Sequence, residues 1–176
     1  GIGLSTAMFS MVNAILIDPL PYANAGRLVR IVEYTPSIGS QHMNGTSMAD
    51  ISIGAWQSVD TALAKLSPYD ENPLTVILPN GAANVVVSDV GRDFFGVLSM
   101  PPIAGRVLGD SDFDPAAPGA AVISDRLARR AFGDAQTALG GSVFVETRAL
   151  TVVGVMAPAF AFPNKDVDIW RTGVQY

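Results

Sequence analysis

The first 17 residues carry no ionisable side chain, and this apolar run limits what the chain can fold into more than any other feature. An α-helix of 17 residues is about 26 Å long, slightly shorter than the ~30 Å hydrocarbon core of a membrane. Its apolar side chains would lie on every side, which is typical of a helix buried in protein or in lipid. Asp18 is the first charged residue, and Pro19 and Pro21 prevent the helix from continuing.

Three interpretations of residues 1–17 stay open. The one we favour is the C-terminal part of a membrane-spanning helix, with Tyr22 suited to the membrane–water interface. The second is a secretory signal peptide, because residues 23–25 read Ala-Asn-Ala, although no basic segment precedes the apolar run. The third is a buried helix of a soluble core.

Composition excludes several classes of protein. The chain has 176 residues, enough for one domain or two small ones. It has no Cys and one His, His42, so disulfides, cysteine zinc sites and multi-histidine metal sites are excluded. The net charge is −5 with 11 Lys and Arg, and this balance argues against nucleic-acid binding, which needs a dense basic surface.

Hydrophobic periodicity predicts a mixed α/β chain. Alternating apolar residues predict strands at 27–34, 74–78, 83–90, 120–123, 142–146, 149–156 and 167–170. Apolar residues at helical spacing predict helices at 48–66, 91–98 and 125–132. Loops are expected at 35–47, 67–73, 99–114 and 157–165.

Local signals refine these elements. Asn80-Gly81 is a strong hairpin signal between two predicted strands. Ser124 can cap the helix over 125–132, and Gly133 can end it. Thr147-Arg148 is unfavourable as the turn of a two-residue hairpin, because Thr disfavours a positive φ. A longer or bulged loop is therefore expected there.

Asp110, Asp112 and Asp114 stand at the spacing that begins a calcium-binding EF-hand loop. Such a loop needs Gly at its sixth position and Glu at its twelfth, where this chain has Pro115 and Ala121. We therefore expect a solvated acidic turn.

Other polar residues suggest sites only weakly. A Ser-His-Asp triad would have to use His42, but the chain has no G-x-S-x-G nucleophile elbow, so a surface His is expected. Asp89 and Asp93 flank a strand-to-helix turn, where a carboxylate favours the helix N-terminus. No nucleophile, base and oxyanion hole come together, and we expect no catalytic, metal or cofactor-binding residue. Trp56 and Trp170 are expected to be core or rim aromatics.

Arg126, Arg129 and Arg130 share one face of the helix predicted over 125–132. Such a face could bind a phosphate or an acidic partner. We expect instead a solvated basic face opposite the apolar residues of the helix.

Five segments in order resemble the MacB-like periplasmic core domain of FtsX/MacB-type ABC-transporter permeases. They are AMFSMVNAILIDPLPYANAGRLVRI (7–31), GRDFFGVLSMPPIAGRVLGDSD (91–112), AAVISDRLARRAFGD (120–134), LTVVGVMAPAFAFP (150–163) and DIW (168–170). The chain departs from the family pattern at Met100, where Gly is common, and at the Thr147-Arg148 turn, where Asp-Gly or Asn-Gly is usual. These departures concern local turns and packing.

The resemblance implies an α+β (mixed α/β) fold with a porter-like βα layer and a smaller inserted α/β lobe. Residues 1–22 would be the end of the first transmembrane helix and a prolyl junction, 23–104 the first half of the porter-like subdomain, and 105–176 the smaller lobe. A further βα segment and three membrane helices would follow Tyr176, so the chain is expected to be a fragment.

The same resemblance implies an extracytoplasmic domain at the inner (plasma) membrane that couples ATP hydrolysis to export or periplasmic work by mechanotransmission, and not an enzyme. ATP and Mg would be bound by a separate nucleotide-binding subunit or domain. Expected partners are the membrane through residues 1–17, an ABC ATPase, a second permease copy and a periplasmic adaptor. The alternatives are a secreted or anchored periplasmic binding protein with an N-terminal signal sequence, and a hydrolase that uses His42.

Overall fold

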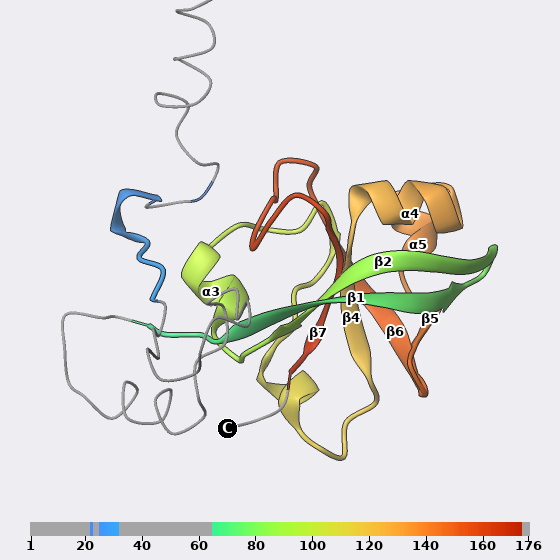
Figure 1. The fold of residues 1–176 in the computed structure, drawn as a ribbon, viewed down its shortest axis with the longest axis horizontal. Helices are drawn as coiled ribbons and strands as arrows, with labels where there is room; N and C mark the ends of the chain where they lie inside the picture. The colour runs from blue at the N-terminus through green and yellow to red at the C-terminus, as the bar shows by residue number, and fades with distance from the viewer. Residues whose placement is uncertain (1–21, 23–24, 32–64, 174–176) are drawn as a thin grey trace, which may run out of the picture.

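The structure is a computed structural model, and it describes residues 22, 25–31 and 65–173 (Figure 1). Several sequence predictions lie outside the described residues: those for residues 1–17, for His42 and Trp56, and for most of the helix over 48–66. Within the described part of the chain, no helix is both long and apolar enough to cross a membrane.

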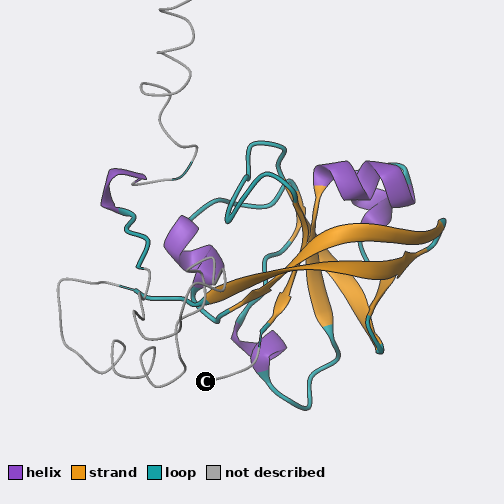
Figure 2. Ribbon diagram, in the orientation of Figure 1, coloured by secondary structure: helices purple, strands orange, loops and turns teal. Residues whose placement is uncertain are grey.

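The described elements are mainly strands, with short helices between them (Figure 2). The strands are β1 (Tyr69–Leu78), β2 (Gly81–Val90), β3 (Ala104–Gly105), β4 (Ala120–Ser124), β5 (Ser142–Val145), β6 (Arg148–Met156) and β7 (Val167–Thr172). The helices are α3 (Phe94–Leu98), α4 (Asp125–Phe132) and α5 (Ala135–Ala138), with 3-10 helices η1 (Ala25–Arg27) and η2 (Asp110–Phe113). The expected mixed α+β fold is confirmed.

The strands form one sheet in the order β3-β6-β4-β7-β2-β1-β5, and β5 also pairs with β6. This extra pairing closes β6, β4, β7, β2, β1 and β5 into a ring, while β3 lies outside it on the edge of β6. The β2–β7 and β4–β6 pairs are parallel, and the other pairs are antiparallel. In Figure 1, β1 and β2 cross in front of β4, β6 and β7.

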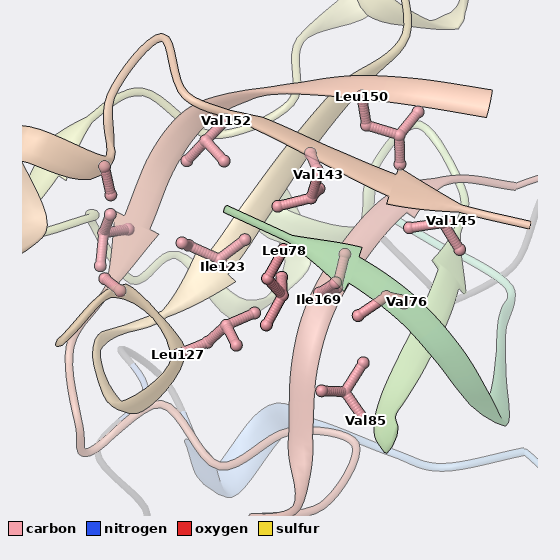
Figure 3. Packing of buried hydrophobic residues seen from close by; sticks show 14 of the residues in the cluster. Val76, Leu78, Val85, Ile123, Leu127, Val143, Val145, Leu150, Val152 and Ile169 are labelled. Carbon is pink, nitrogen blue, oxygen red and sulfur yellow. The ribbon is translucent and has the colours of Figure 1, made fainter. Parts of the chain in front are cut away.

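The first core fills the inside of this ring. Its side chains come from alternate positions of the strands, because successive residues of a strand point to opposite faces. Figure 3 shows Val76, Ile123, Val143 and Ile169 converging, with Leu127 of α4 packed against them. Leu127, Ala128 and Ala138 extend this core into α4 and α5.

A second core lies on the other face of β2, β4 and β7. It is rich in aromatic side chains and is covered by α3, η2 and the loop before β7. Val122 and Trp170 point into it, whereas their neighbours Ile123 and Ile169 point into the first core. The central strands are therefore buried on both faces, which explains their nearly continuous apolar sequence.

Two irregularities interrupt the ladders of the sheet. Val86 and Val87 of β2 face Val167 and Ile169 of β7, so Asp168 is an extra, bulged residue. A similar shift between β4 and β6 leaves Val153 as the extra residue. A bulge re-aims the side chain that it carries, and this decides the direction of Asp168.

The helix over 125–132 and its boundaries are confirmed. The Ser124 Oγ accepts the N–H of Leu127 at 3.0 Å, and Gly133 follows the helix with a φ of 94°. The hairpin at Asn80-Gly81 is confirmed as well, because Leu78 and Gly81 are paired residues and enclose a two-residue turn. The helix predicted at 91–98 is present but begins only at Phe94.

Three local predictions are wrong. The loop predicted at 67–73 ends at residue 68, because β1 begins at Tyr69 and pairs with β2 along its whole length. The predicted strand at 27–34 is not formed in its described part, where Ala25–Arg27 is a 3-10 helix followed by irregular backbone. The loop expected between β5 and β6 is a tight turn, since Val145 pairs with Arg148.

In this tight turn the residue with a positive φ is not Thr147 but the residue before it. That residue, Glu146, has a φ of 55°. Glu146 also accepts a hydrogen bond from Arg171 at 2.9 Å, and this contact helps to hold a backbone conformation that a non-glycine residue rarely adopts.

Strands from both sides of Gly105 belong to the same sheet. β1 and β2 precede Gly105, and β4, β5, β6 and β7 follow it. The division of the chain into residues 23–104 and 105–176 stays a prediction, and any such boundary would pass through a shared sheet.

Candidate functional site

Among the described N-terminal residues, Tyr22 contacts the folded domain most closely, and Leu28 and Arg30 contact it as well. The side chain of Tyr22 is buried, at 7% exposure, with its ring edge-on to Phe160 at 5.9 Å and Phe162 at 6.3 Å between centroids. Its hydroxyl oxygen accepts the backbone N–H of Ala161 at 3.2 Å. Burial raises the pKa of this hydroxyl, and the hydrogen bond from Ala161 opposes the rise.

The sequence suggests the membrane–water interface for Tyr22, which stays a prediction, and the structure shows that its ring is buried against the domain. The ring is held by an aromatic cluster, defined as Tyr22, Tyr69, Phe94, Phe95, Phe160, Phe162 and Trp170. Neighbouring rings of the cluster meet edge-on, stacked or tilted, with centroids 5.1–6.5 Å apart. Such contacts stabilise by about 0.5–1.5 kcal/mol each beyond the burial of area.

Trp170 joins the aromatic cluster to β7. Its side chain has no exposed surface, and its ring is 5.1 Å from that of Phe160. Its Nε1–H donates to the backbone oxygen of Phe162 at 3.1 Å. The loop that carries Phe160 and Phe162 is thereby fixed to β7 by a hydrogen bond as well as by ring packing.

A polar rim borders the cluster on the side of residues 25–31. The Arg30 guanidinium lies 5.9 Å over the ring of Tyr69, and Asn164 donates a hydrogen bond to Glu71. Burial raises the pKa of Glu71, while the charge of Arg30 and the Asn164 bond oppose the rise. The rim therefore connects the N-terminal segment, β1 and the loop before β7.

The three arginines of α4 are largely exposed, as expected for a solvated face, but each lies near a carboxylate. Arg129 is 2.8 Å from Asp125, and Arg126 is 2.9 Å from Asp168. Arg130 is 3.8 Å from the second oxygen of Asp168. Much of the positive charge of this face is therefore compensated within the domain.

Asp168 is the polar residue that sequence reasoning missed. It was noticed only as part of the Asp-Ile-Trp motif, yet it is 4% exposed and contacts two of the arginines. A carboxylate inside a short apolar strand could have indicated this role, because a buried charge requires partners of opposite charge or hydrogen-bond donors. The sequence could not name those partners, which lie about 40 residues away along the chain.

Asp89 and Asp93 do not act together at the N-terminus of α3. Asp93 occupies the position before the helix without a capping hydrogen bond, and its carboxylate lies 3.2 Å from Lys65. Asp89 belongs to β2 and binds Arg171 of β7 at 2.7 Å. Since Asp89 and Arg171 are paired residues of adjacent strands, their ion pair reinforces the sheet.

The three carboxylates of the acidic run have separate partners. Asp112 binds Arg106 at 2.5 and 2.8 Å and accepts the N–H of Gly109 at 2.8 Å. Asp114 accepts the N–H of Ala116 at 2.8 Å, and Asp110 lies 3.4 Å from Arg92. Among the described residues, no group of three or more His, Cys, Asp or Glu side chains is placed to hold a metal ion.

Asp112→Asn is expected to lower the free energy of unfolding at pH 7 by about 1 kcal/mol. The hydrogen bonds from Arg106 are the main cause that lowers the pKa of Asp112 in the folded protein. A carboxylate with a lowered folded pKa stabilises above its unfolded pKa of about 4 and loses this contribution as the pH falls. Urea unfolding between pH 7 and pH 3 should therefore show a shallower acid loss in the variant. An unchanged pH profile would contradict the assignment.

An open groove of about 520 Å³ is lined by Ile103, Asp125, Arg129, Gly133, Asp134, Ala135 and Gln136. Its charged groups are used by the fold, since Asp125 binds Arg129 and Asp134 caps α5 through Thr137. The hydrogen bond from the Thr137 N–H is the main cause that lowers the pKa of Asp134. This groove thus offers structural ion pairs and caps rather than a free acid and base.

The described residues therefore form one sheet-based domain in which Tyr22 is packed into the second core. Comparison with known proteins gives a family model, described as the MacB-like periplasmic core domain, that matches residues 1–172. No curated protein was matched by sequence comparison.

Two solved structures share the fold at low sequence identity. The periplasmic region of MacB from Actinobacillus actinomycetemcomitans aligns at a TM-score of 0.57 and 18% identity, covering 69% of this chain and 54% of that one. The extracellular domain of the noncanonic ABC-type transporter YknZ from Gram-positive bacteria aligns at 0.58 and 18%, covering 72% and 63%. The chain thus spans between about half and two thirds of the length of these domains.

Proposed function

Because this chain belongs to the MacB-like periplasmic core domain family, we propose that it is the extracytoplasmic domain of an ABC-transporter permease in the inner (plasma) membrane. We propose further that it couples ATP hydrolysis in the cytoplasm to substrate export or other periplasmic work by mechanotransmission. In this proposal the domain is not itself an enzyme.

The observation that carries the proposal is the burial of Tyr22 in the aromatic cluster. Tyr22 comes directly after the apolar run and its two prolines, so the helix that the sequence predicts for this run would be joined to the domain core by only a few residues. Proline fixes its own φ and stiffens such a junction. A displacement of the helix would then move the domain instead of being absorbed by a linker.

The closed ring of strands supports the same role. Its core is densely apolar, and β2, β4 and β7 are buried on both faces. Packed interiors have low compressibility and transmit strain. A domain of this kind can move as one body when its attachment point is displaced.

The partners in this proposal follow from the family. A separate nucleotide-binding subunit or domain binds ATP and Mg, and the permease works as a homodimer or with a paired permease. A periplasmic adaptor is a further partner of the same proposal. The transported substrate is not part of the proposal, because fold analogy does not identify cargo.

The proposal is tested in the full-length permease, reconstituted in nanodiscs with its ATPase. A fluorescent donor is placed at the exposed residue Gln136, and the acceptor is a lipid headgroup dye. Energy transfer should change when ATP hydrolysis is trapped with vanadate. Tyr22→Ala should abolish most of this change while the ATPase remains active, because the anchor in the aromatic cluster is lost.

Tyr22→Phe is the matched control. It keeps the ring and removes only the hydroxyl that accepts the Ala161 N–H, so most of the change in energy transfer should remain. The absence of a vanadate-dependent change in the wild type would refute mechanotransmission. An undiminished change in Tyr22→Ala would refute the role of Tyr22 as the anchor.

A further inference from the structure

Asp168 is a buried carboxylate in the bulge of β7. It faces α4, a helix that is not adjacent to β7 in the sequence. It is 4% exposed, and the register shift opposite Val86 and Val87 makes it the extra residue of the ladder. Without the bulge, Asp168 would alternate with Val167 and Ile169. The bulge instead lets its side chain reach the N-terminal end of α4.

The contacts of Asp168 converge on one of its oxygens. Oδ1 accepts hydrogen bonds from the Ser124 hydroxyl at 2.5 Å, from Arg126 Nε at 3.1 Å and from Arg126 Nη2 at 2.9 Å. Oδ2 lies 3.8 Å from Arg130. These bonds, together with the arginine charge, compensate the burial of the carboxylate.

The bond to Ser124 extends into the helix. The Ser124 hydroxyl donates a hydrogen bond to Asp168 Oδ1 and accepts the N–H of Leu127 at 3.0 Å. Asp168 thereby orients the side chain that caps α4. Arg126 adds a second attachment, because Nη2 also donates to the backbone oxygen of Asp166 at 3.1 Å.

The same strand carries Trp170 on its other side. Two residues after Asp168, Trp170 packs against Phe160, and Phe160 packs against Tyr22. Strand β7 is therefore held to α4 by Asp168 and to the aromatic cluster by Trp170.

We propose that Asp168 is the positioning residue that locks α4 to β7, so that α4 and α5 move together with the Tyr22 anchor. Its part in transmission rests on the proposed function, whereas the lock is a property of the domain itself. Removing the charge leaves Arg126 without its carboxylate and weakens the orientation of Ser124. The helix pair then changes its position relative to β7 without unfolding.

The experiment measures a distance across the lock in the full-length permease. Spin labels are placed at cysteines introduced at the exposed residues Gln136 of α5 and Ala159 of the loop before β7, and residues 1–176 contain no other Cys. Double electron–electron resonance should give a narrow distribution of the distance between the two labels in the wild type, with and without trapped ATP. Asp168→Asn should broaden it about twofold, because the helix pair then samples several positions.

Val76→Ala is the matched control for lost stability. Val76 is fully buried in the first core on β1, so the variant is destabilised by a cavity while the lock stays intact. Its distance distribution should stay narrow. If Asp168→Asn does not fold, Arg126→Gln tests the same lock, since it removes the guanidinium and leaves the carboxylate and Ser124.

A distribution as narrow in the folded Asp168→Asn or Arg126→Gln variant as in Val76→Ala would overturn the proposal. Equal broadening in Val76→Ala would overturn it as well, because general destabilisation would then explain the effect. This outcome is independent of the energy-transfer experiment with Tyr22. The lock can therefore fail while mechanotransmission holds, and mechanotransmission can fail while the lock holds.

Discussion

Trp170→Ala is expected to lower the free energy of unfolding by about 4 kcal/mol, within the usual range for removing a buried large aromatic side chain. Trp170 has no exposed surface and packs against Phe160 within the second core. The variant leaves a large cavity and removes the donor that binds the backbone oxygen of Phe162. Urea unfolding followed by circular dichroism measures the loss.

Trp170→Phe separates the two contributions of this residue. It keeps an aromatic ring in the cluster but leaves the Phe162 oxygen without its indole donor, so a smaller loss of about 2 kcal/mol is expected. A loss below about 1 kcal/mol in Trp170→Ala would mean that the second core closes around the cavity, contrary to tight packing at this position.

Gly154→Ala is expected to cost about 3 kcal/mol, at the upper end of what overpacking usually costs. A Cβ at Gly154 would collide with the backbone oxygen of Arg106 and lie 2.9 Å from its carbonyl carbon. Both atoms belong to rigid backbone, so β3 would have to move away from β6. That movement would strain the bonds from Ile103 N to Val155 O at 2.8 Å and from Arg106 N to Val153 O at 2.9 Å.

Gly109→Ala is the matched control for this substitution. Gly109 has an extended backbone with a φ of −116°, and no atom lies within 4 Å of its added Cβ. Its stability should change by less than about 0.5 kcal/mol. If Gly154→Ala lowered the free energy of unfolding as little as Gly109→Ala does, β3 would move away from the added Cβ at little cost. Lack of space would then not explain the glycine at position 154.

The fold class and several boundaries could be predicted because they depend on local signals. The helix over 125–132 was predicted to the residue, since Ser124 and Gly133 act on the backbone next to them. The β1–β2 hairpin followed from Asn80-Gly81, whose turn preference is also local. Family membership rests on ordered motifs, and those are properties of the sequence alone.

The errors arise where distant contacts outweigh local preference. Residues 69–73 contain Asp70, Glu71 and Pro73, which suggest a loop, but pairing with β2 holds them in a strand. Glu146 takes a positive φ that its residue type disfavours, and its bond to Arg171 comes from a strand 25 residues away. Neither partner is visible in a local window of sequence.

The candidate site shows the same division. The sequence located the junction at Asp18–Tyr22, because an uncharged run and two prolines are visible without any structure. It did not show that Tyr22 points into the domain, because the rings that receive it come from positions 138 or more residues further along the chain. Asp168 was hidden for a similar reason, as its partners lie at the end of β4 and on α4.

The sequence by itself therefore determined the apolar run, its prolyl end, the alternation of strands, the capped helix and the family. These follow from periodicity, residue preference and motif order, which act within a few residues. Only the tertiary structure decided that the strands close into a ring, that Tyr22 enters an aromatic cluster and that Asp168 joins α4 to β7. Each depends on which distant segments meet, and that is settled by packing and register across the whole sheet.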